Sequence, residues 1–170
     1  MRDYSRRLAV LAALGLSVAS AMGLIGDVRA QEEVVPLDKL PKAIVESVKK
    51  RFPGLEMVKA EKETEKGKTV YEVSLKNKER NIDVTLTPEG QIQSIEKEIG
   101  LQDVPKVVMD AFNAKYDKAK VKVIEEIIHV TNGKESLDYY EFHLTAANNQ
   151  EIEVLVNPMG KITGEPEPKK

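Results

Sequence analysis

The stretch Leu40-Pro41-Lys42-Ala43-Ile44-Val45 recurs 64 positions later in similar form, as Val104-Pro105-Lys106-Val107-Val108-Met109. A second stretch, Leu86-Thr87-Pro88-Glu89-Gly90-Gln91-Ile92, recurs 70 positions later as Val156-Asn157-Pro158-Met159-Gly160-Lys161-Ile162. A repeated unit of about 60 residues is too long for one turn of a solenoid and has the length of a small domain. The sequence therefore predicts two tandem repeats, at residues 40–99 and 104–163, joined by a short linker at 100–103.

Each repeat is expected to begin with a helix. One face of each predicted helix is apolar, because apolar or aromatic residues recur every four positions. These residues are Leu40, Ile44, Val48 and Phe52 in the first repeat and Val104, Val108, Phe112 and Tyr116 in the second. Pro41 and Pro105 suit the first turn of a helix, where the missing N–H has no partner in the helix and the fixed φ is already helical.

After each helix, apolar residues alternate with polar ones, which is typical of half-buried antiparallel strands. The alternating stretches are Tyr71–Leu75 and Ile82–Leu86 in the first repeat, and Tyr140–Leu144 and Ile152–Val156 in the second. Each pair is expected to follow a further strand, at Leu55–Glu65 and Ala119–Thr131, and to precede a short one, at Gln91–Glu98 and Lys161–Thr163. The predicted fold class is α+β, with two tandem repeats that each pack one helix on a four-stranded antiparallel sheet and leave the other sheet face exposed.

The expected first strand of the second repeat does not keep one alternation. Val121 and Val123 follow one phase, whereas Ile128 and Val130 follow the other. A β-bulge adds one residue to a strand and so changes its phase. We therefore expect a bulge near Glu125-Glu126.

The first 30 residues have the features of a secretory signal peptide. A basic start precedes an apolar stretch, and Val28-Arg29-Ala30 suits a signal peptidase, so cleavage after Ala30 is expected. A retained anchor is the alternative, because the apolar stretch is near the minimum length that spans a bilayer. Ser5-Arg6-Arg7 also allows a twin-arginine signal. The mature protein is expected to be periplasmic or secreted and not stably inserted in a membrane, with mobile ends at 31–39 and 164–170.

The expected mature chain is weakly acidic. Removal of residues 1–30 takes four of the 26 basic and two of the 28 acidic side chains, which leaves a net charge of −4. Such a balance argues against a basic stripe for nucleic acid or a polybasic membrane patch. The chain has no cysteine, which excludes disulfides, a thiol nucleophile and a lipidated cysteine. Stability must come from packing, and two such small repeats are expected to pack together.

The order of these elements resembles the PepSY-like group, which is similar in fold to the beta-lactamase inhibitor protein. The residues that carry the resemblance are the helix starts Pro41 and Pro105, the helix ends Phe52 and Tyr116, the segments Tyr71-Glu72-Val73 and Tyr140-Glu141-Phe142, and the paired Pro-x-Gly turns. The resemblance covers nearly the whole mature chain. It implies a tandem α+β fold whose exposed sheet can hold another protein, and a role in binding or restraining extracytoplasmic enzymes. It carries no inhibitory residue over to this chain.

Sequence motifs for catalysis are absent. The chain has no Gly-x-Ser-x-Gly elbow, no phosphate-binding glycine loop and no His-Glu-x-x-His zinc helix. Its carboxylates are numerous but spread among lysines, as is typical of a solvated surface. No enzyme activity and no cofactor are therefore predicted.

One group of residues could bind a divalent metal. Glu141 and His143 lie two apart on one expected strand, so their side chains point to the same side. Glu153 on the next strand, together with His129, could complete a set of nitrogen and oxygen ligands. The equivalent positions of the first repeat include no histidine, and polar residues are the rule on a solvent-facing sheet, so no metal site is assigned.

The leading hypothesis is a non-enzymatic protein that binds an extracytoplasmic protein through the exposed sheet face and the hairpin loops. The candidate contact residues share the outward side of the second sheet and are Tyr139, Glu141, His143, Glu153 and Leu155. Tyr139 and Leu155 could instead form a contact between the two repeats. The alternatives are a structural or chaperone-like envelope protein, a small-ligand or metal sensor, and an enzyme, which would need a concave polar pocket.

Overall fold

The computed structural model describes residues 33–65 and 67–164. The first part of the chain forms β1 (Glu33–Val34), η1 (Leu37–Lys39), α1 (Lys42–Arg51), β2 (Glu56–Glu65), β3 (Lys68–Asn77), β4 (Arg80–Leu86) and β5 (Ile92–Ile99). The second part forms η2 (Leu101–Asp103), α2 (Lys106–Tyr116), β6 (Lys120–Thr131), β7 (Lys134–Thr145), β8 (Glu151–Val156) and β9 (Ile162–Gly164). None of the helices in these ranges is long and apolar enough to cross a membrane.

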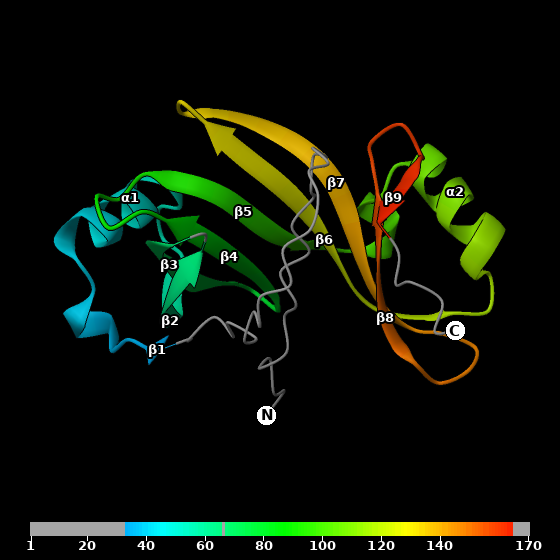
Figure 1. Cartoon of the computed structure of the whole chain (residues 1–170), viewed down its shortest axis with the longest axis horizontal. Coiled ribbons are helices and arrows are strands. Elements are labelled where there is room, and N and C mark those ends of the chain that lie inside the picture. The colour runs from blue at the N-terminus through cyan, green and yellow to red at the C-terminus, as the bar shows by residue number, and fades with distance from the viewer. Residues whose placement is uncertain (1–32, 66, 165–170) are drawn as a thin grey trace, which may run out of the picture.

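The nine strands form one antiparallel sheet, and their order in the sheet is their order in the chain (Figure 1). The expected combination of helices and antiparallel strands is confirmed. The sequence predicts four strands for each repeat, whereas the structure joins all the strands into a single sheet. The junction is β5 with β6, which pair from Ser94 opposite His129 to Ile99 opposite Ile124. This pairing satisfies backbone groups that two separate sheets would expose at their edges.

Both helices pack on the same face of this sheet. In α1, Ile44 and Val48 lie in one core with residues of β3, β4 and β5, and in α2, Val108 and Phe112 lie in a second core with residues of β5 to β8. Ile95 of β5 belongs to the first core and Ile99 to the second. Because these two residues are four apart on one strand, they point to the same side. Figure 1 shows the helices near opposite ends of the sheet. The opposite side is called the helix-free face below.

The chain just before the first helix differs from the expectation of a mobile segment at 31–39. Glu33 and Val34 pair with Lys62 and Glu61 of β2, and the N–H of Val35 donates to the carbonyl of Ala60 at 2.9 Å. The long strand β2 offers a free edge to which this segment can bond, although Val34 itself is 67% exposed. At the other end, β9 includes Gly164, where the tail was expected to start. The signal peptide expected at 1–30 and the tail positions 165–170 lie outside the described residues.

The predicted bulge near Glu125-Glu126 is wrong in position. Strand β6 pairs with β5 without interruption through these two residues. Its register with β7 shifts instead on either side of them, between Val121 and Val123 and between Ile127 and Ile128. A bulge at Glu125-Glu126 would break the pairing that joins the repeats. At the first observed shift the extra residue is Lys122 of β6, and at the second it is Asp138 of β7.

A turn glycine packs against the first residues of the helix in each repeat. Gly90 and Gly160 have φ of +81° and +78°, in the left-handed region that L side chains rarely adopt. A Cβ at Gly90 would lie 2.5 Å from the carbonyl oxygen of Ala43, and one at Gly160 would lie 2.6 Å from that of Val107. The two repeated Pro-x-Gly turns thus hold the two helices by close backbone contact.

Replacing Gly160 by alanine should lower the free energy of unfolding by about 2–4 kcal/mol, from the left-handed φ and the clash with Val107 together. Gly133 is the matched control: its φ is +75°, but no atom lies within 4 Å of an added Cβ. Gly133→Ala should therefore cost only the backbone part, about 1–2 kcal/mol. Urea unfolding of both variants measures the difference. Equal losses would show that the contact with the helix adds nothing.

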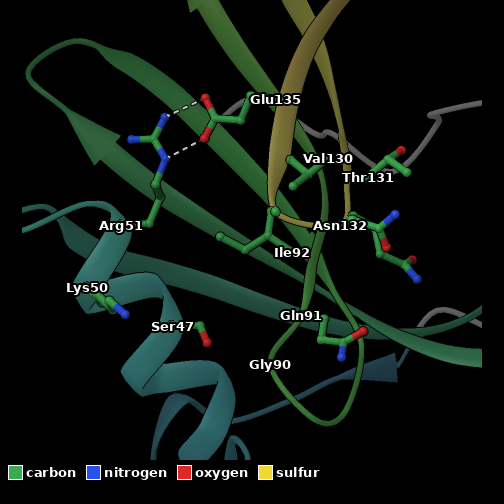
Figure 2. Close-up of a pocket in the computed structure, with 12 residues that line it drawn as sticks. Ser47, Lys50, Arg51, Gly90, Gln91, Ile92, Val130, Thr131, Asn132 and Glu135 are labelled. Atoms are coloured by element: carbon green, nitrogen blue, oxygen red, sulfur yellow. Dashed lines mark hydrogen bonds and ion pairs between the residues drawn. The ribbon is translucent and has the colours of Figure 1, made fainter.

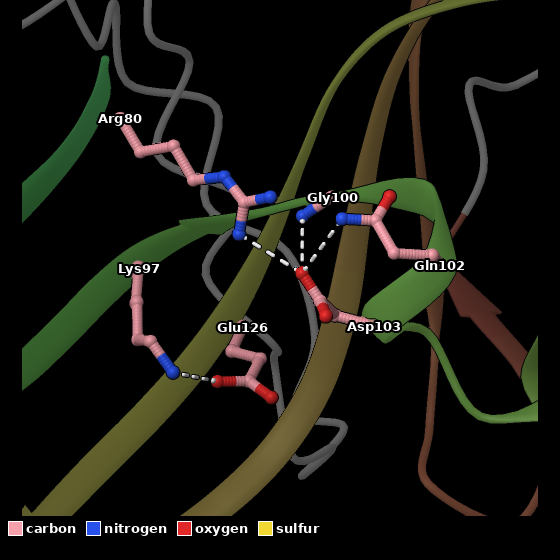
Figure 3. Close-up of polar contacts among 6 residues, drawn as sticks. All are labelled: Arg80, Lys97, Gly100, Gln102, Asp103 and Glu126. Atoms are coloured by element: carbon pink, nitrogen blue, oxygen red, sulfur yellow. Dashed lines mark hydrogen bonds and ion pairs between the residues drawn. The ribbon is translucent and has the colours of Figure 1, made fainter. Parts of the chain in front are cut away.

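Side-chain contacts reinforce the junction of the repeats around the linker (Figure 3). Asp103 accepts a hydrogen bond from Arg80 at 2.9 Å and another from the N–H of Gly100 at 3.1 Å. These bonds hold the pKa of Asp103 below its ordinary value. The Nζ of Lys97 in β5 lies 3.1 Å from the Oε2 of Glu126 in β6. The two repeats are therefore connected by backbone pairing and by ion pairs.

Candidate binding face

The helix-free face is built from every second residue of each strand. Across the second half of the sheet, register places Glu125 of β6 opposite Glu141 of β7, and Glu141 opposite Leu155 of β8. The next row places His143 opposite Glu153. The sequence prediction that Glu141, His143 and Glu153 share one side of the sheet thus agrees with the register, since period-two alternation alone decides it.

His143 lies at the centre of a group of carboxylates. Its Nε2 is 3.1 Å from Glu125 Oε2 and 3.6 Å from Glu141 Oε1, and its Nδ1 is 3.5 Å from Glu153 Oε1. Glu125 is only 3% exposed. The three carboxylates come from three neighbouring strands, so the imidazole links β6, β7 and β8.

The surroundings of His143 act on its pKa in opposite directions. Burial of the imidazole lowers the pKa, because the charged form loses hydration. The hydrogen bond to Glu125 and the negative charges of Glu125, Glu141 and Glu153 raise it and prevail, so the pKa of His143 lies above its ordinary value of 6.5. The folded protein therefore holds this proton more tightly than the unfolded chain does.

This difference predicts a pH dependence of stability. The contribution of the His143 imidazolium is complete below the unfolded pKa of about 6.5 and is lost as the pH rises through the higher folded pKa. His143→Gln keeps a group that can donate to Glu125 but does not titrate. The variant should therefore not show the part of the stability loss at rising pH that comes from His143. Urea unfolding of both proteins in steps above about pH 6 measures the effect. If the free energy of unfolding of the variant fell as much over the same pH range, the pH dependence would come from other groups.

The structure does not bring His129 to this group. His129 lies opposite Ser94 and Ser136, and its Nδ1 is 3.5 Å from Asp138. Ser136 and His143 are seven positions apart on β7, which is about 23 Å along a strand. The place that the sequence interpretation gave to His129 is taken by Glu125. The sequence did not indicate Glu125, because the irregular alternation of β6 does not show on which face of the sheet this residue lies.

The two bulky candidates differ in their surroundings. Tyr139 lies opposite Ile127 and is half-buried, and burial raises its pKa to about 12, with Glu141 and Glu96 adding to the shift. Leu155 is only 8% exposed, because β9 runs beside it and places Gly164 against its side chain. Tyr139 therefore remains a candidate contact residue, whereas Leu155 is covered by its own sheet.

Carboxylate and imidazole atoms converge at two places among the described residues. One set is Glu125, Glu141 and His143, and the other is Asp83, Glu96 and Glu125, with the possible ligand atoms of each set within 4.8 Å of one another. The first set offers a nitrogen and oxygens, as zinc ligands do, and the second offers oxygens alone. Both sets lie on the helix-free face and share Glu125.

A groove of about 690 Å³ lies where the hairpin between β6 and β7 reaches α1 (Figure 2). Its walls come from the helix, from the turn before β5, and from the hairpin tip. Arg51 of α1 donates two hydrogen bonds to the carboxylate of Glu135, at 2.7 and 2.9 Å. This contact joins residues 84 positions apart, and no periodic pattern in the sequence indicates it. It fixes the hairpin of the second repeat against the helix of the first.

Comparison of the sequence with protein families gives a match to the family described as "Putative beta-lactamase-inhibitor-like, PepSY-like", at residues 26–94 and again at 91–163. The chain belongs to this PepSY-like family. The two matches confirm the resemblance and the presence of two PepSY-like repeats. No curated protein matches the chain.

Solved structures share the PepSY-like fold of this chain. A DUF2874 family protein from Bacteroides uniformis has a TM-score of 0.60 at 17% identity, covering 74% of this chain and 88% of that one. A protein from Bacteroides eggerthii described among "putative periplasmic proteins" has a TM-score of 0.59 at 17% identity, covering 74% and 87%. A BLIP-like protein from Bacteroides fragilis has a TM-score of 0.55 at 17% identity, covering 73% and 83%. At these identities the likeness concerns the fold.

Proposed function

We propose that this PepSY-like protein is a non-enzymatic binding protein of the cell envelope, which binds or restrains another extracytoplasmic protein on its helix-free face. The observation that carries the proposal is the placement of both helices on one side of the sheet. The other side runs through β5 and β6 without a break, so both repeats contribute to one face.

The chemistry of the face supports recognition more than catalysis. One of its histidines, His143, is held among carboxylates of three strands, which raise its pKa and engage the imidazole in contacts within the sheet. Tyr139 supplies aromatic surface beside the charged side chains. Aromatic residues of this kind are common at the centres of protein interfaces.

An extracytoplasmic location is supported by two observations. The sequence predicts a signal peptide at residues 1–30. A protein of similar fold from Bacteroides eggerthii is described among "putative periplasmic proteins". We therefore place the partner in the periplasm or outside the cell as well. The family description and the BLIP-like neighbour support an inhibitor-like role for the complex.

The test is capture of envelope proteins by the purified protein and by two variants. Tyr139→Ala with Glu141→Lys and Glu153→Lys alters the helix-free face and should abolish capture, while circular dichroism should show that the variant remains folded. Val107→Ala with Glu46→Lys and Asp110→Lys makes the same charge change on the exposed sides of the helices, and it should leave capture intact. Loss with the helix variant instead, or equal capture by all three proteins, would contradict the proposal.

A further inference from the structure

The groove between α1 and the tip of the β6–β7 hairpin lies on the helix side of the sheet and not on the helix-free face (Figure 2). Its apolar side chains are those of Ile92 in β5 and Val130 in β6, which pack against the first core but are only partly buried. Pairing of β5 with β6 ends at Ser94 opposite His129, so the two strands are not paired with each other at these positions. The groove therefore has an apolar part where the strands separate.

Local backbone geometry holds two walls of this groove in place. At the hairpin tip, Asn132 and Gly133 have φ of +53° and +75°, as in the two-residue turns that suit the twist of a β-hairpin. The turn before β5 lies so close to α1 that a Cβ on Gly90 would be 2.9 Å from the Oγ of Ser47. Binding between these walls therefore needs little reordering of the protein, which lowers its cost.

The charged side chains of the groove leave one positive charge over. Arg51 and Glu135 neutralise each other, and the hydrogen bonds between them raise the pKa of Arg51 and lower that of Glu135. Lys50 lines the same groove and has neither an ion pair nor a hydrogen bond among the described residues. The groove therefore favours a ligand with a negative charge, although the chain as a whole is weakly acidic.

The other polar side chains of the lining are neutral. They come from α1, from β5 and the turn before it, and from the hairpin tip, and among the described residues none has a side-chain partner: Ser47, Gln91, Gln93, Thr131 and Asn132. Gln93 is the extra residue of a β-bulge, since its neighbours Ile92 and Ser94 pair with consecutive residues of β4. Such bulges re-aim side chains beside functional sites. Glutamine and asparagine amides each offer a donor and an acceptor, as a peptide group does.

We propose that this groove binds the C-terminal end of a short, extended peptide that ends in an apolar residue. The free carboxylate pairs with Lys50, and the last side chain packs on Ile92 and Val130. The preceding peptide groups bond to the amides of the lining. A volume of about 690 Å³ suits a ligand of this size. A neutral sugar lacks the charge for Lys50, and a fatty acid lacks the hydrogen-bonding groups. The site is separate from the helix-free face, so it goes beyond the proposed function.

The test measures by anisotropy how the purified protein binds a fluorescent tetrapeptide, three alanines followed by leucine with a free carboxylate. Amidation of the peptide and Lys50→Gln should each weaken binding about fivefold, and amidation should have no further effect in the variant, because both remove the same ion pair. A peptide that ends in serine should also bind at least about fivefold more weakly. Lys49→Gln is the matched control: Lys49 is exposed on the same helix but does not line the groove, so the affinity should change less than about twofold.

Two-dimensional NMR of the isotope-labelled protein locates the bound peptide. The backbone amide shifts should change at Ile92, Val130 and Asn132 and stay unchanged at Glu141 and Glu153 on the helix-free face. The inference would be overturned by absence of binding, by equal binding of the amidated peptide, by equal weakening from Lys49→Gln and Lys50→Gln, or by shifts outside the groove. Binding of maltose in place of the peptide would instead assign the groove to a sugar. None of these results depends on capture of a protein by the helix-free face.

Discussion

Replacement of Phe142 by alanine is expected to lower the free energy of unfolding by about 3–5 kcal/mol. Phe142 is 0% exposed, and its ring stacks on that of Phe112 of α2 with centroids 4.3 Å apart. Removing the ring loses its transfer free energy and leaves a cavity between β7 and α2, which the surrounding strands cannot close without breaking pairing. Chemical unfolding followed by circular dichroism measures the loss.

Met159→Ala is the control for this substitution. Met159 is 81% exposed, so its truncation should change stability by less than about 0.5 kcal/mol. Ile44→Ala, in the core of the first repeat, should cost about 2–4 kcal/mol. All three variants should unfold in one transition, because the repeats share a sheet. A loss below about 1 kcal/mol for Phe142→Ala would contradict the described core.

Separating the repeats is expected to have the largest effect. A fragment of residues 31–100 keeps α1 and β2 to β5 but loses β6, so the β5 residues from Ser94 to Ile99 lose their partners. It also loses the bonds from Arg51 to Glu135 and from Arg80 to Asp103. A unit of this size buries only about 60% of its unfolded surface. The fragment should therefore lose its cooperative melt, or melt far below the intact protein.

Thermal melts and size-exclusion chromatography of the fragment and the intact protein check this expectation. Mixing the fragment with residues 101–170 provides the control, since restored pairing of β5 with β6 should recover part of the stability. The newly exposed edge of β5 should also make the isolated fragment associate with itself. A monomeric fragment with the melting temperature of the intact protein would show that the repeats are independent.

Periodicity was sufficient to predict the helices and most strands, because apolar spacing reports which side of an element is buried. Ile44 and Phe112 illustrate this, since each belongs to a four-residue series and each lies in a core. The joining of the repeats could not be predicted in the same way. The pairing of β5 with β6 depends on backbone groups that every residue carries, so it leaves no pattern in the side chains. The pairing of β1 with β2 was missed for the same reason.

The candidate site was predictable only where alternation was regular. Glu141, His143 and Glu153 lie on regular strands, and their common side followed from their spacing. Glu125 lies between two register shifts of β6, so its position against His143 could not be read from the sequence. His129 lies beyond the second shift, and grouping it with His143 by residue type ignored their separation along the strands.

The most direct test of the binding function is photocrosslinking in cells that export the protein. A photoreactive aromatic residue replaces Tyr139 on the helix-free face in one variant, and Val107 on the exposed side of α2 in another. We expect a crosslink from position 139 to a second extracytoplasmic protein and none from position 107. Crosslinking from position 107 alone, or from neither position, would contradict the helix-free face as the docking surface.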